Sequence, residues 1–314
     1  MLSAPRRAVL LMAYGGPERL EDVEPFLRDV RGGRPTPTEL VAEVRARYSA
    51  IGGGSPLLAI TRAQAAALEA ELNRAGPEGW QVFVGMRHWH PYVADAVREI
   101  AAAGHRRVVA LCLAPQYSRM SIGAYFARLD EALAALADPP EVARVESWHD
   151  HPGFLDAVAE KVAGALARLP VPAGEVEVIF TAHSLPRRIV EAGDPYDDQV
   201  RATARRVADR AAARAGVRFP WTFCYQSVAA GATDWLGPEV TDVVADLARA
   251  GRRHLLAAPI GFVSDHVEVL YDLDVEARAA AETHGARLTR TESLNTSVAF
   301  IAALVEVVRS GGVR

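Results

Sequence analysis

The sequence predicts an α/β protein built from two similar domains, each with a parallel four-stranded sheet covered by helices on both faces. Two observations and one general rule lead to this prediction. Short apolar runs with strand character alternate with long segments of helical periodicity, and the alternation occurs four times in each half of the chain. Half of the 314 residues are hydrophobic, which is enough to bury a sizeable core. Strands that alternate with helices form parallel sheets with both faces covered.

The expected strands divide evenly between the two halves. They cover residues 8–14, 80–88, 107–115 and 142–148 in the first half, and residues 176–184, 220–227, 254–262 and 286–294 in the second. The main helical segments cover residues 61–74, 91–103, 152–168, 194–215 and 239–250, and a last helix is expected over 296–309.

The Pro- and Gly-rich segment LPVPAG, at residues 169–174, predicts the hinge between the domains. We therefore expect an N-terminal domain over residues 1–170 and a C-terminal domain over residues 171–295. The C-terminal helical segment, residues 296–314, could pack back on the first domain or lie on the second.

The charge balance and the hydropathy pattern exclude several classes of protein. The 39 acidic and 35 basic residues give a net charge of −4, whereas a nucleic-acid-binding surface normally shows as a basic excess. No window approaches the ~20 apolar residues of a membrane span, and the N-terminus lacks the pattern of a signal peptide. We therefore expect no nucleic-acid partner, no membrane span and a cytoplasmic location.

The two cysteines, Cys112 and Cys224, lie far apart in apolar, strand-like runs. Their spacing matches neither an iron–sulfur centre nor a zinc site. We expect two buried thiols in a reducing compartment.

Ligands of open α/β sheets bind beyond the carboxyl ends of the strands, so the residues after each strand are candidates. The first strand is followed by Tyr14-Gly-Gly-Pro17, which is either an ordinary turn or a close approach to a ligand. The Gly-rich run Gly52–Pro56 suits an anion or forms a flexible linker. Neither run matches a dinucleotide motif or a nucleotide P-loop.

Histidines follow three of the expected strands. For the pairs His88/His90 and His149/His151, surface loop positions are favoured over metal ligation. His183 ends a strongly apolar strand in the predicted cleft between the domains, where a structural role and ligation of a divalent metal are both open.

An acidic run follows the strand at residues 254–262. A helix is expected to start there with Ser264 or Asp265 as its N-cap. Glu268, Asp272 and Glu276 would then form one stripe in which like charges repel by a few tenths of a kcal/mol per pair. A bound divalent cation would offset this repulsion, and a solvated helix start is the alternative.

Six segments, taken together, resemble the ferrochelatases over essentially the whole chain and in the same order. They are LLMAYGGPE, RYSAIGGGSPL, APQYSRMSIGAY, FTAHSLP, YQS followed by WLGPEV, and GFVSDHVEVLYDLD. FTAHSLP at residues 180–186 and GFVSDHVEVLYDLD at residues 261–274 are the most specific. Within the family the chain is most similar to the water-soluble bacterial branch that uses coproporphyrin III.

The resemblance implies a chelatase fold, with two Rossmann-like domains and a porphyrin in the interdomain cleft. It implies His183 and Glu268 as the catalytic, metal-site pair and Asp272 and Glu276 as outer metal-relay acids. The porphyrin contacts that it implies are Tyr14, Arg31, Arg47, Tyr48, Ser55 and Tyr125. At Gly123, two residues before Tyr125, the relatives often have a longer polar residue. One propionate contact implied by the resemblance is therefore in doubt.

The implied activity is insertion of Fe²⁺ into a porphyrin in haem biosynthesis. Tyr14, whose phenol can ligate iron in the product, favours coproporphyrin III over protoporphyrin IX. The resemblance implies no cofactor beyond the substrate Fe²⁺ and no iron–sulfur cluster. We expect a monomer with at most transient contacts to other haem-pathway enzymes.

Two alternatives stay open at this stage. One is a chelatase for another tetrapyrrole, such as a sirohydrochlorin-like ring, and the other is a non-enzymatic haem or metal carrier. Which of His183 and Glu268 delivers the metal and which accepts protons is also open.

Overall fold

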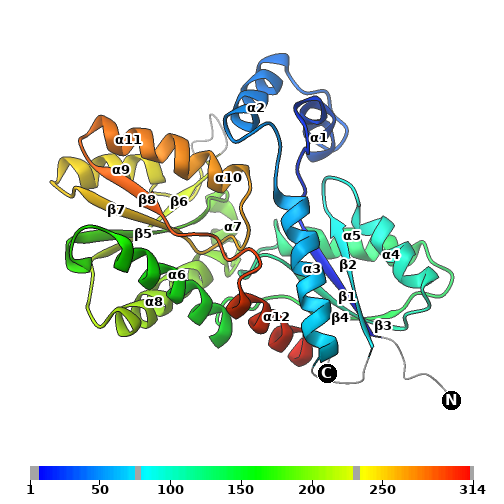
Figure 1. Ribbon diagram of the computed structural model, residues 1–314. Helices are drawn as coiled ribbons and strands as arrows, with labels where there is room; N and C mark the ends of the chain where they lie inside the picture. The colour runs from blue at the N-terminus through cyan, green and yellow to red at the C-terminus, as the bar shows by residue number, and fades with distance from the viewer. Residues whose placement is uncertain (1–6, 75–78, 229–233, 312–314) are drawn as a thin grey trace. The chain divides into compact units, whose positions relative to one another are not determined.

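The structure is a computed structural model that describes residues 7–74, 79–228 and 234–311 (Figure 1). It divides into two compact units. Unit 1 contains the described residues up to Trp148 together with those from Asn295 onward, and unit 2 runs from His149 to Leu294.

Unit 1 contains a parallel sheet with the strand order β2-β1-β3-β4. The strands are β1 (Arg7–Ala13), β2 (Trp80–Met86), β3 (Arg107–Cys112) and β4 (Glu141–Val145). The central strand β1 buries Ala8 to Met12 completely, as a strand covered on both faces requires.

Unit 2 repeats the same topology, with the strand order β6-β5-β7-β8 and all strands parallel. The strands are β5 (Val176–His183), β6 (Trp221–Gln226), β7 (His254–Pro259) and β8 (Arg287–Arg290). All eight expected strands and the fold class are confirmed. Strand β7 stops at Pro259, short of the expected residue 262, and proline has no N–H to continue the ladder.

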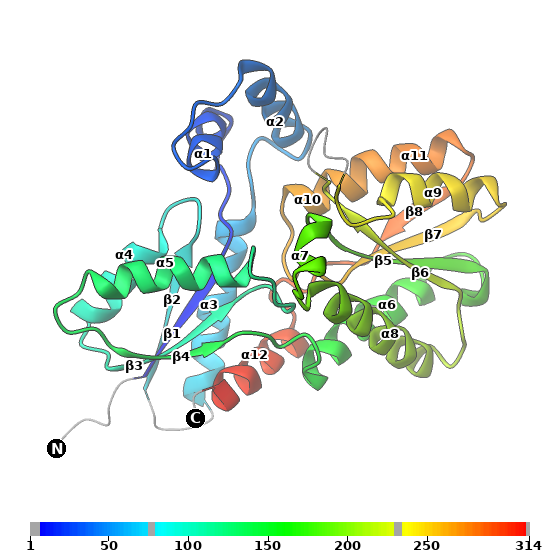
Figure 2. The same cartoon turned by 180° about the vertical axis from the view of Figure 1, so that it is seen from behind.

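Helices cover both faces of each sheet (Figures 1 and 2). In unit 1, α4 (Val93–Ala102) and α5 (Ile122–Ala134) cover one face, and α3 (Leu57–Arg74) and α12 (Val298–Gly311) cover the other. In unit 2, α9 (Val240–Arg249) and α11 (Arg278–Thr283) lie on one face, and α6 (Pro152–Arg168) and α8 (Tyr196–Ala215) lie on the other. The six helical segments expected from periodicity are all present.

Several helices lie outside the helical ranges expected from the sequence. Among them are α1 (Val23–Val30), α2 (Thr38–Ala50), α5 and the short α7 (Arg187–Glu191). Helix α2 buries only Val41 and Tyr48, so it lacks the apolar periodicity that reveals a helix in a sequence. No helix in the described part of the chain has the length and apolar character that crossing a membrane requires.

The boundary between the units lies between Trp148 and His149, not at residue 170 as the Pro- and Gly-rich segment suggested. The physical reason is that α6 packs along α8, where Arg210 and Asp156 form an ion pair at 3.1 Å. Helix α12 packs against α3 and belongs to unit 1.

Cys112 and Cys224 are buried free thiols, as expected. Burial raises the pKa of both thiols well above the usual range, so both stay protonated at neutral pH.

The two Gly-rich segments of unit 1 pack tightly on each other. The amide of Ser55 donates to the carbonyl oxygen of Pro17 at 2.8 Å. A Cβ added to Gly54 would lie 2.0 Å from the carbonyl oxygen of Glu18, and one added to Gly16 would lie 2.8 Å from the Cβ of Ser55. Gly54 and Ser55 are therefore packed against residues 16–18, which argues against the flexible-linker interpretation.

We expect Gly54→Ala to lower the free energy of unfolding by about 1–3 kcal/mol, because the new methyl group collides with backbone. Gly164→Ala is the matched control. In α6 the added Cβ would meet only the flexible side chain of Arg168 at 3.5 Å. Alanine is the better helix former, so this control should raise stability by about 0.5–1 kcal/mol. Urea denaturation measures both, and a Gly54→Ala variant that is as stable as the wild type would contradict the close packing at Gly54.

Candidate active site

His183 and Glu268 meet in unit 2. His183 is the last residue of β5, and Glu268 is the second residue of α10 (Val267–Leu270). The Nε2 atom of His183 lies 3.5 Å from Oε1 of Glu268, and the two side chains are 27% and 32% exposed. The predicted pair is therefore brought together at the carboxyl edge of a parallel sheet, half-buried but open to solvent.

His266 joins this pair and was not predicted from the sequence. Its Nε2 atom lies 3.6 Å from Oε2 of Glu268, so the carboxylate sits between two imidazoles. Its Nδ1 atom is buried and has no hydrogen-bond partner among the described residues. The ring of His266 packs on Phe262 with centroids 4.5 Å apart. The only signal in the sequence was a histidine two residues before the acid.

The pKa values of His183 and Glu268 are both shifted at this site. Burial alone would lower the pKa of His183, but the charge of Glu268 and hydrogen bonding outweigh it, so this pKa is raised above the usual 6.5. Burial alone would raise the pKa of Glu268, but His183 and His266 hold it well below its usual range. Glu268 is therefore ionised at neutral pH, so the site carries a negative charge that can attract a cation.

Backbone and ring contacts orient His183. Its Nδ1 atom is hydrogen-bonded to the carbonyl oxygen of Ser184, which can only accept, so Nδ1 carries a proton. In the neutral imidazole the lone pair then lies on Nε2, the atom that faces Glu268. The hydroxyl of Tyr196 donates to the His183 carbonyl oxygen at 2.8 Å and anchors its backbone. This is the arrangement of a metal-ligating histidine whose other nitrogen donates to a carbonyl.

The acidic segment is not the single α-helix that the sequence predicted. Helix α10 begins after His266, so neither Ser264 nor Asp265 is its N-cap. The π-helical turn η3 (Asp272–Ala277) follows, and the amide of Glu276 donates to the carbonyl of Tyr271, five residues earlier, at 3.0 Å. The expected stripe required α-helical spacing from Glu268 to Glu276, but this spacing ends at Tyr271. π-Turns of this kind are frequent at functional sites.

The two outer acids have different surroundings. Asp272 is buried and accepts a hydrogen bond from the hydroxyl of Ser227. Ser227 follows β6 and has a φ of 60°, an uncommon conformation for a residue other than glycine. Glu276 is half-buried on η3. Asp272 is therefore not part of a solvated helix start.

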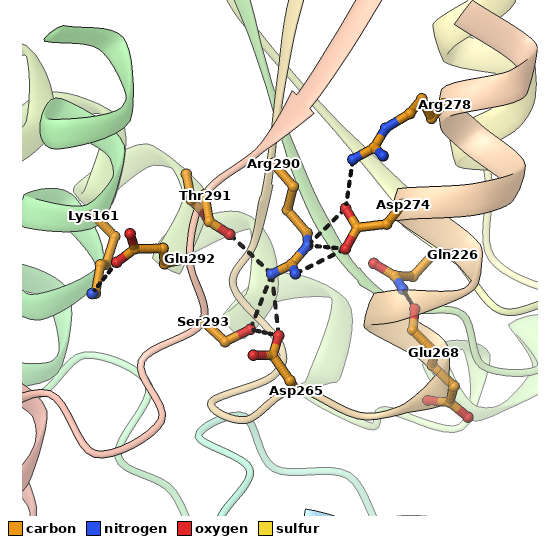
Figure 3. Close-up of polar contacts among 10 residues, drawn as sticks. All are labelled: Lys161, Gln226, Asp265, Glu268, Asp274, Arg278, Arg290, Thr291, Glu292 and Ser293. Atoms are coloured by element: carbon orange, nitrogen blue, oxygen red, sulfur yellow. Dashed lines mark hydrogen bonds and ion pairs between the residues drawn. The ribbon is translucent and has the colours of Figure 1, made fainter. Parts of the chain in front are cut away.

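Arg290, at the end of β8, secures the acidic segment at two points (Figure 3). Its guanidinium donates to both carboxylate oxygens of Asp274, at 2.9 and 3.1 Å, and lies 3.2 Å from Asp265. Ser293 donates to Asp265 at 2.7 Å. Asp265 and Asp274 are thus structural partners of one largely buried arginine.

In unit 1, Tyr14 follows β1 at the carboxyl edge of the sheet and is 38% exposed. Its ring packs 4.7 Å from His88 and 6.4 Å from Phe26, measured between centroids. His88 is only 5% exposed, and its Nδ1 atom is 2.8 Å from the carboxylate of Asp29, so the surface position favoured for it is wrong. His90, in contrast, is exposed, as that interpretation required.

The other predicted porphyrin contacts of unit 1 lie in separate places. Tyr48 and Ser55 converge on Gly16, whose added Cβ would meet the Tyr48 hydroxyl at 3.6 Å. Arg47 pairs with Glu43 at 3.0 Å on α2. The remaining two are Arg31, whose buried Nε has no hydrogen-bond partner among the described residues, and Tyr125, whose buried ring lies 5.5 Å from the guanidinium of Arg87.

Comparison with known proteins gives a consistent result. The family model for Ferrochelatase matches residues 6–311. A ferrochelatase of Herpetosiphon aurantiacus is 41% identical over 306 residues, covering 96% of this chain and 98% of the relative. A coproporphyrin III ferrochelatase of Geobacillus kaustophilus is 41% identical over 303 residues, covering 96% and 94%. The coproporphyrin III ferrochelatase of Bacillus subtilis is 37% identical over 310 residues, covering 98% of each.

Among solved structures, SirB from Bacillus subtilis with Fe³⁺ superposes with a TM-score of 0.60 at 10% identity and covers 98% of this chain and 96% of that one. This likeness concerns the fold. The sequence relatives and the family model decide the family, and the chain belongs to the ferrochelatases.

Proposed function

We propose that this protein inserts Fe²⁺ into a porphyrin in haem biosynthesis, as a lyase-class metal chelatase, and that coproporphyrin III is its preferred ring. The observation that carries the proposal is the His183–Glu268 pair at 3.5 Å in a chain of the ferrochelatase family. Relatives that are named coproporphyrin III ferrochelatases support the choice of ring. Family membership disfavours the carrier and the sirohydrochlorin-type chelatase.

Metallation requires that Fe²⁺ lose water and gain four nitrogen ligands while two pyrrole N–H protons leave the ring. Neutral His183 has a lone pair on Nε2 that suits Fe²⁺. Glu268 beside it becomes a stronger base once His183 has lost its proton, because the imidazolium charge is the main cause of its lowered pKa. A cation can bind Nε2 of His183 only when the imidazole is neutral, so a proton held there must leave first, and the raised pKa increases the share of protonated imidazole. The pair therefore couples arrival of the metal to movement of a proton.

Asp272 and Glu276 are proposed to relay the hydrated cation towards Glu268. Support comes from their place on the π-turn that follows α10. Carboxylates suit a partly hydrated divalent cation. Ser227 donates a hydrogen bond to Asp272 and so fixes the position of its carboxylate.

Tyr14, Arg31, Arg47, Tyr48, Ser55 and Tyr125 are proposed as the porphyrin contacts. The half-exposed phenol of Tyr14 at a strand end is accessible to an iron ligand. The two arginines suit propionates, of which coproporphyrin III has more than protoporphyrin IX. Propionate binding would supply energy to buckle the ring and expose the pyrrole lone pairs. A cytoplasmic monomer without cofactor or iron–sulfur cluster, in transient contact with other haem-pathway enzymes, stays a prediction.

Anaerobic Fe²⁺ insertion, followed by absorbance with coproporphyrin III and protoporphyrin IX side by side, tests the function. We expect kcat/KM for coproporphyrin III to be at least about tenfold higher, which corresponds to about 1.4 kcal/mol of differential transition-state binding. A preference for protoporphyrin IX would contradict the proposed preference for coproporphyrin III but would still support the chelatase activity. Tight binding of both rings without iron insertion would contradict the enzymatic function and favour a non-enzymatic carrier.

Glu268→Gln should lower kcat by about 10²–10⁴-fold, the usual contribution of a positioned acid or base, because the amide cannot accept the proton. Porphyrin affinity, measured by fluorescence quenching, should stay within about twofold because the substitution removes no proposed porphyrin contact. Glu282→Gln, on the exposed side of α11, is the matched control and should be fully active. Lost porphyrin affinity with residual turnover would show that Glu268 binds the ring.

The pKa of His183, measured by NMR in the metal-free protein, should lie above 6.5 and should fall in Glu268→Gln, because the neighbouring carboxylate raises it. The ion pair should stabilise the folded protein fully below the unfolded pKa of about 6.5, and this contribution should be lost as the pH rises through the folded pKa. The resonance is assigned by its absence in His183→Ala. An unchanged or higher pKa in Glu268→Gln would rule out the coupling.

A further inference from the structure

Gln226 connects the strand of His183 to the helix of Glu268. It is the last residue of β6, is fully buried, and lies opposite His183 in the register of the sheet. Its Oε1 accepts a hydrogen bond from the hydroxyl of Thr181 at 2.6 Å. Its Nε2 donates to the backbone carbonyl of Glu268 (Figure 3). One side-chain amide thus has a partner at each end.

The orientation of this amide follows from its partners. The Glu268 carbonyl only accepts, so the group that faces it must be the NH₂ of Gln226. The oxygen then faces Thr181, whose hydroxyl can donate. A flipped amide would set two acceptors against each other in a site without exposure to water, which is unfavourable.

Both ends of the bridge are close to the metal-site residues. Thr181 is two residues before His183 on β5, and side chains two apart on a strand point to the same face. The other end is the backbone of Glu268 itself, on a helix of only four residues that has no side-chain cap. The bridge therefore links the two elements whose separation sets the 3.5 Å between Nε2 of His183 and Oε1 of Glu268.

The next residue serves the same segment. Ser227, with its φ of 60°, donates to the carboxylate of Asp272, one turn after Glu268. The end of β6 thus contacts both the backbone at Glu268 and the side chain of Asp272. A strained non-glycine conformation persists only where its surroundings hold it, so the end of β6 is firmly fixed against the acidic segment.

We propose that Gln226 is a positioning residue for metal transfer. Its amide fixes the carbonyl of Glu268 relative to Thr181, so that the Glu268 carboxylate and His183 act on one Fe²⁺ ion. The proposal rests on the proposed function. Misplacement of a reacting group by about 1 Å can cost about 10²-fold in rate, so a single buried bridge is sufficient to matter.

The test compares variants that break the bridge at either end. Gln226→Met keeps the length of the side chain and removes both hydrogen bonds, and we expect kcat for Fe²⁺ insertion to fall about 100-fold. Thr181→Val removes only one end and should lower kcat about tenfold. Thr181→Ser keeps the hydroxyl and should restore at least about half of the wild-type kcat. In all three, KM for the porphyrin should stay within about twofold, because no proposed ring contact changes.

Thr203→Val is the matched control for stability. Thr203 is fully buried in the same unit, and its hydroxyl donates to the backbone carbonyls of Gln199 and His149, away from the metal site. The Thr203→Val variant should lose as much stability as the Thr181→Val variant and should keep the wild-type kcat. Equal losses of kcat in the two valine variants, or a serine variant as slow as the valine variant, would overturn the positioning role.

A second measurement separates this inference from the proposed function. Co²⁺ is titrated into the porphyrin-free protein and its binding is followed by absorbance. Gln226→Met and Thr181→Val should bind Co²⁺ about tenfold more weakly than the wild type, and Thr203→Val should bind it equally well. If the wild type inserts no iron but this order of affinities holds, the proposed function fails and the positioning role stands. If the wild type inserts iron and Gln226→Met matches it in both measurements, the positioning role fails.

Discussion

At the strand ends of unit 2, the half-buried carboxylate of Glu268 determines which side chains must lie close together. An ionised group withdrawn from water is unfavourable unless opposite charges or hydrogen bonds surround it. His183 and His266 supply them from two sides, at 3.5 and 3.6 Å. Removal of either imidazole would leave the charge less compensated, so the end of β5 and the loop before α10 are held together by the same group.

The acidic segment owes its shape to contacts outside itself. Arg290 holds Asp265 and Asp274 on either side of Glu268, Ser227 holds Asp272, and Gln226 holds the Glu268 backbone. Between these contacts the helix changes from α to π at Asp272, and the side chain of Asp272 is buried. The acids of this segment therefore fall into two groups. Asp265 and Asp274 are structural, whereas Glu268, Asp272 and Glu276 are proposed for the cation.

Much of the fold could be predicted because burial on both faces of a sheet demands continuous apolar strands, and such runs are visible in a sequence. The eight strands, the amphipathic helices and the position of His183 at a strand end are examples. Helix α2, which buries little, gave no such signal. The unit boundary was misplaced because the contact of α6 with α8, and not chain composition, decides it. His88 was misjudged because its partner, Asp29, is remote in the sequence.

The sequence by itself determined the fold class, the family and the residue types of the candidate site. Those follow from local periodicity and from motifs that a linear chain displays. Only the tertiary structure decided which polar atoms meet. It placed His266 beside Glu268, Gln226 between Thr181 and the Glu268 carbonyl, and Arg290 between two aspartates. The physical reason is that hydrogen bonds and ion pairs act over about 3 Å. Their partners are therefore set by strand register and helix packing, not by separation along the chain.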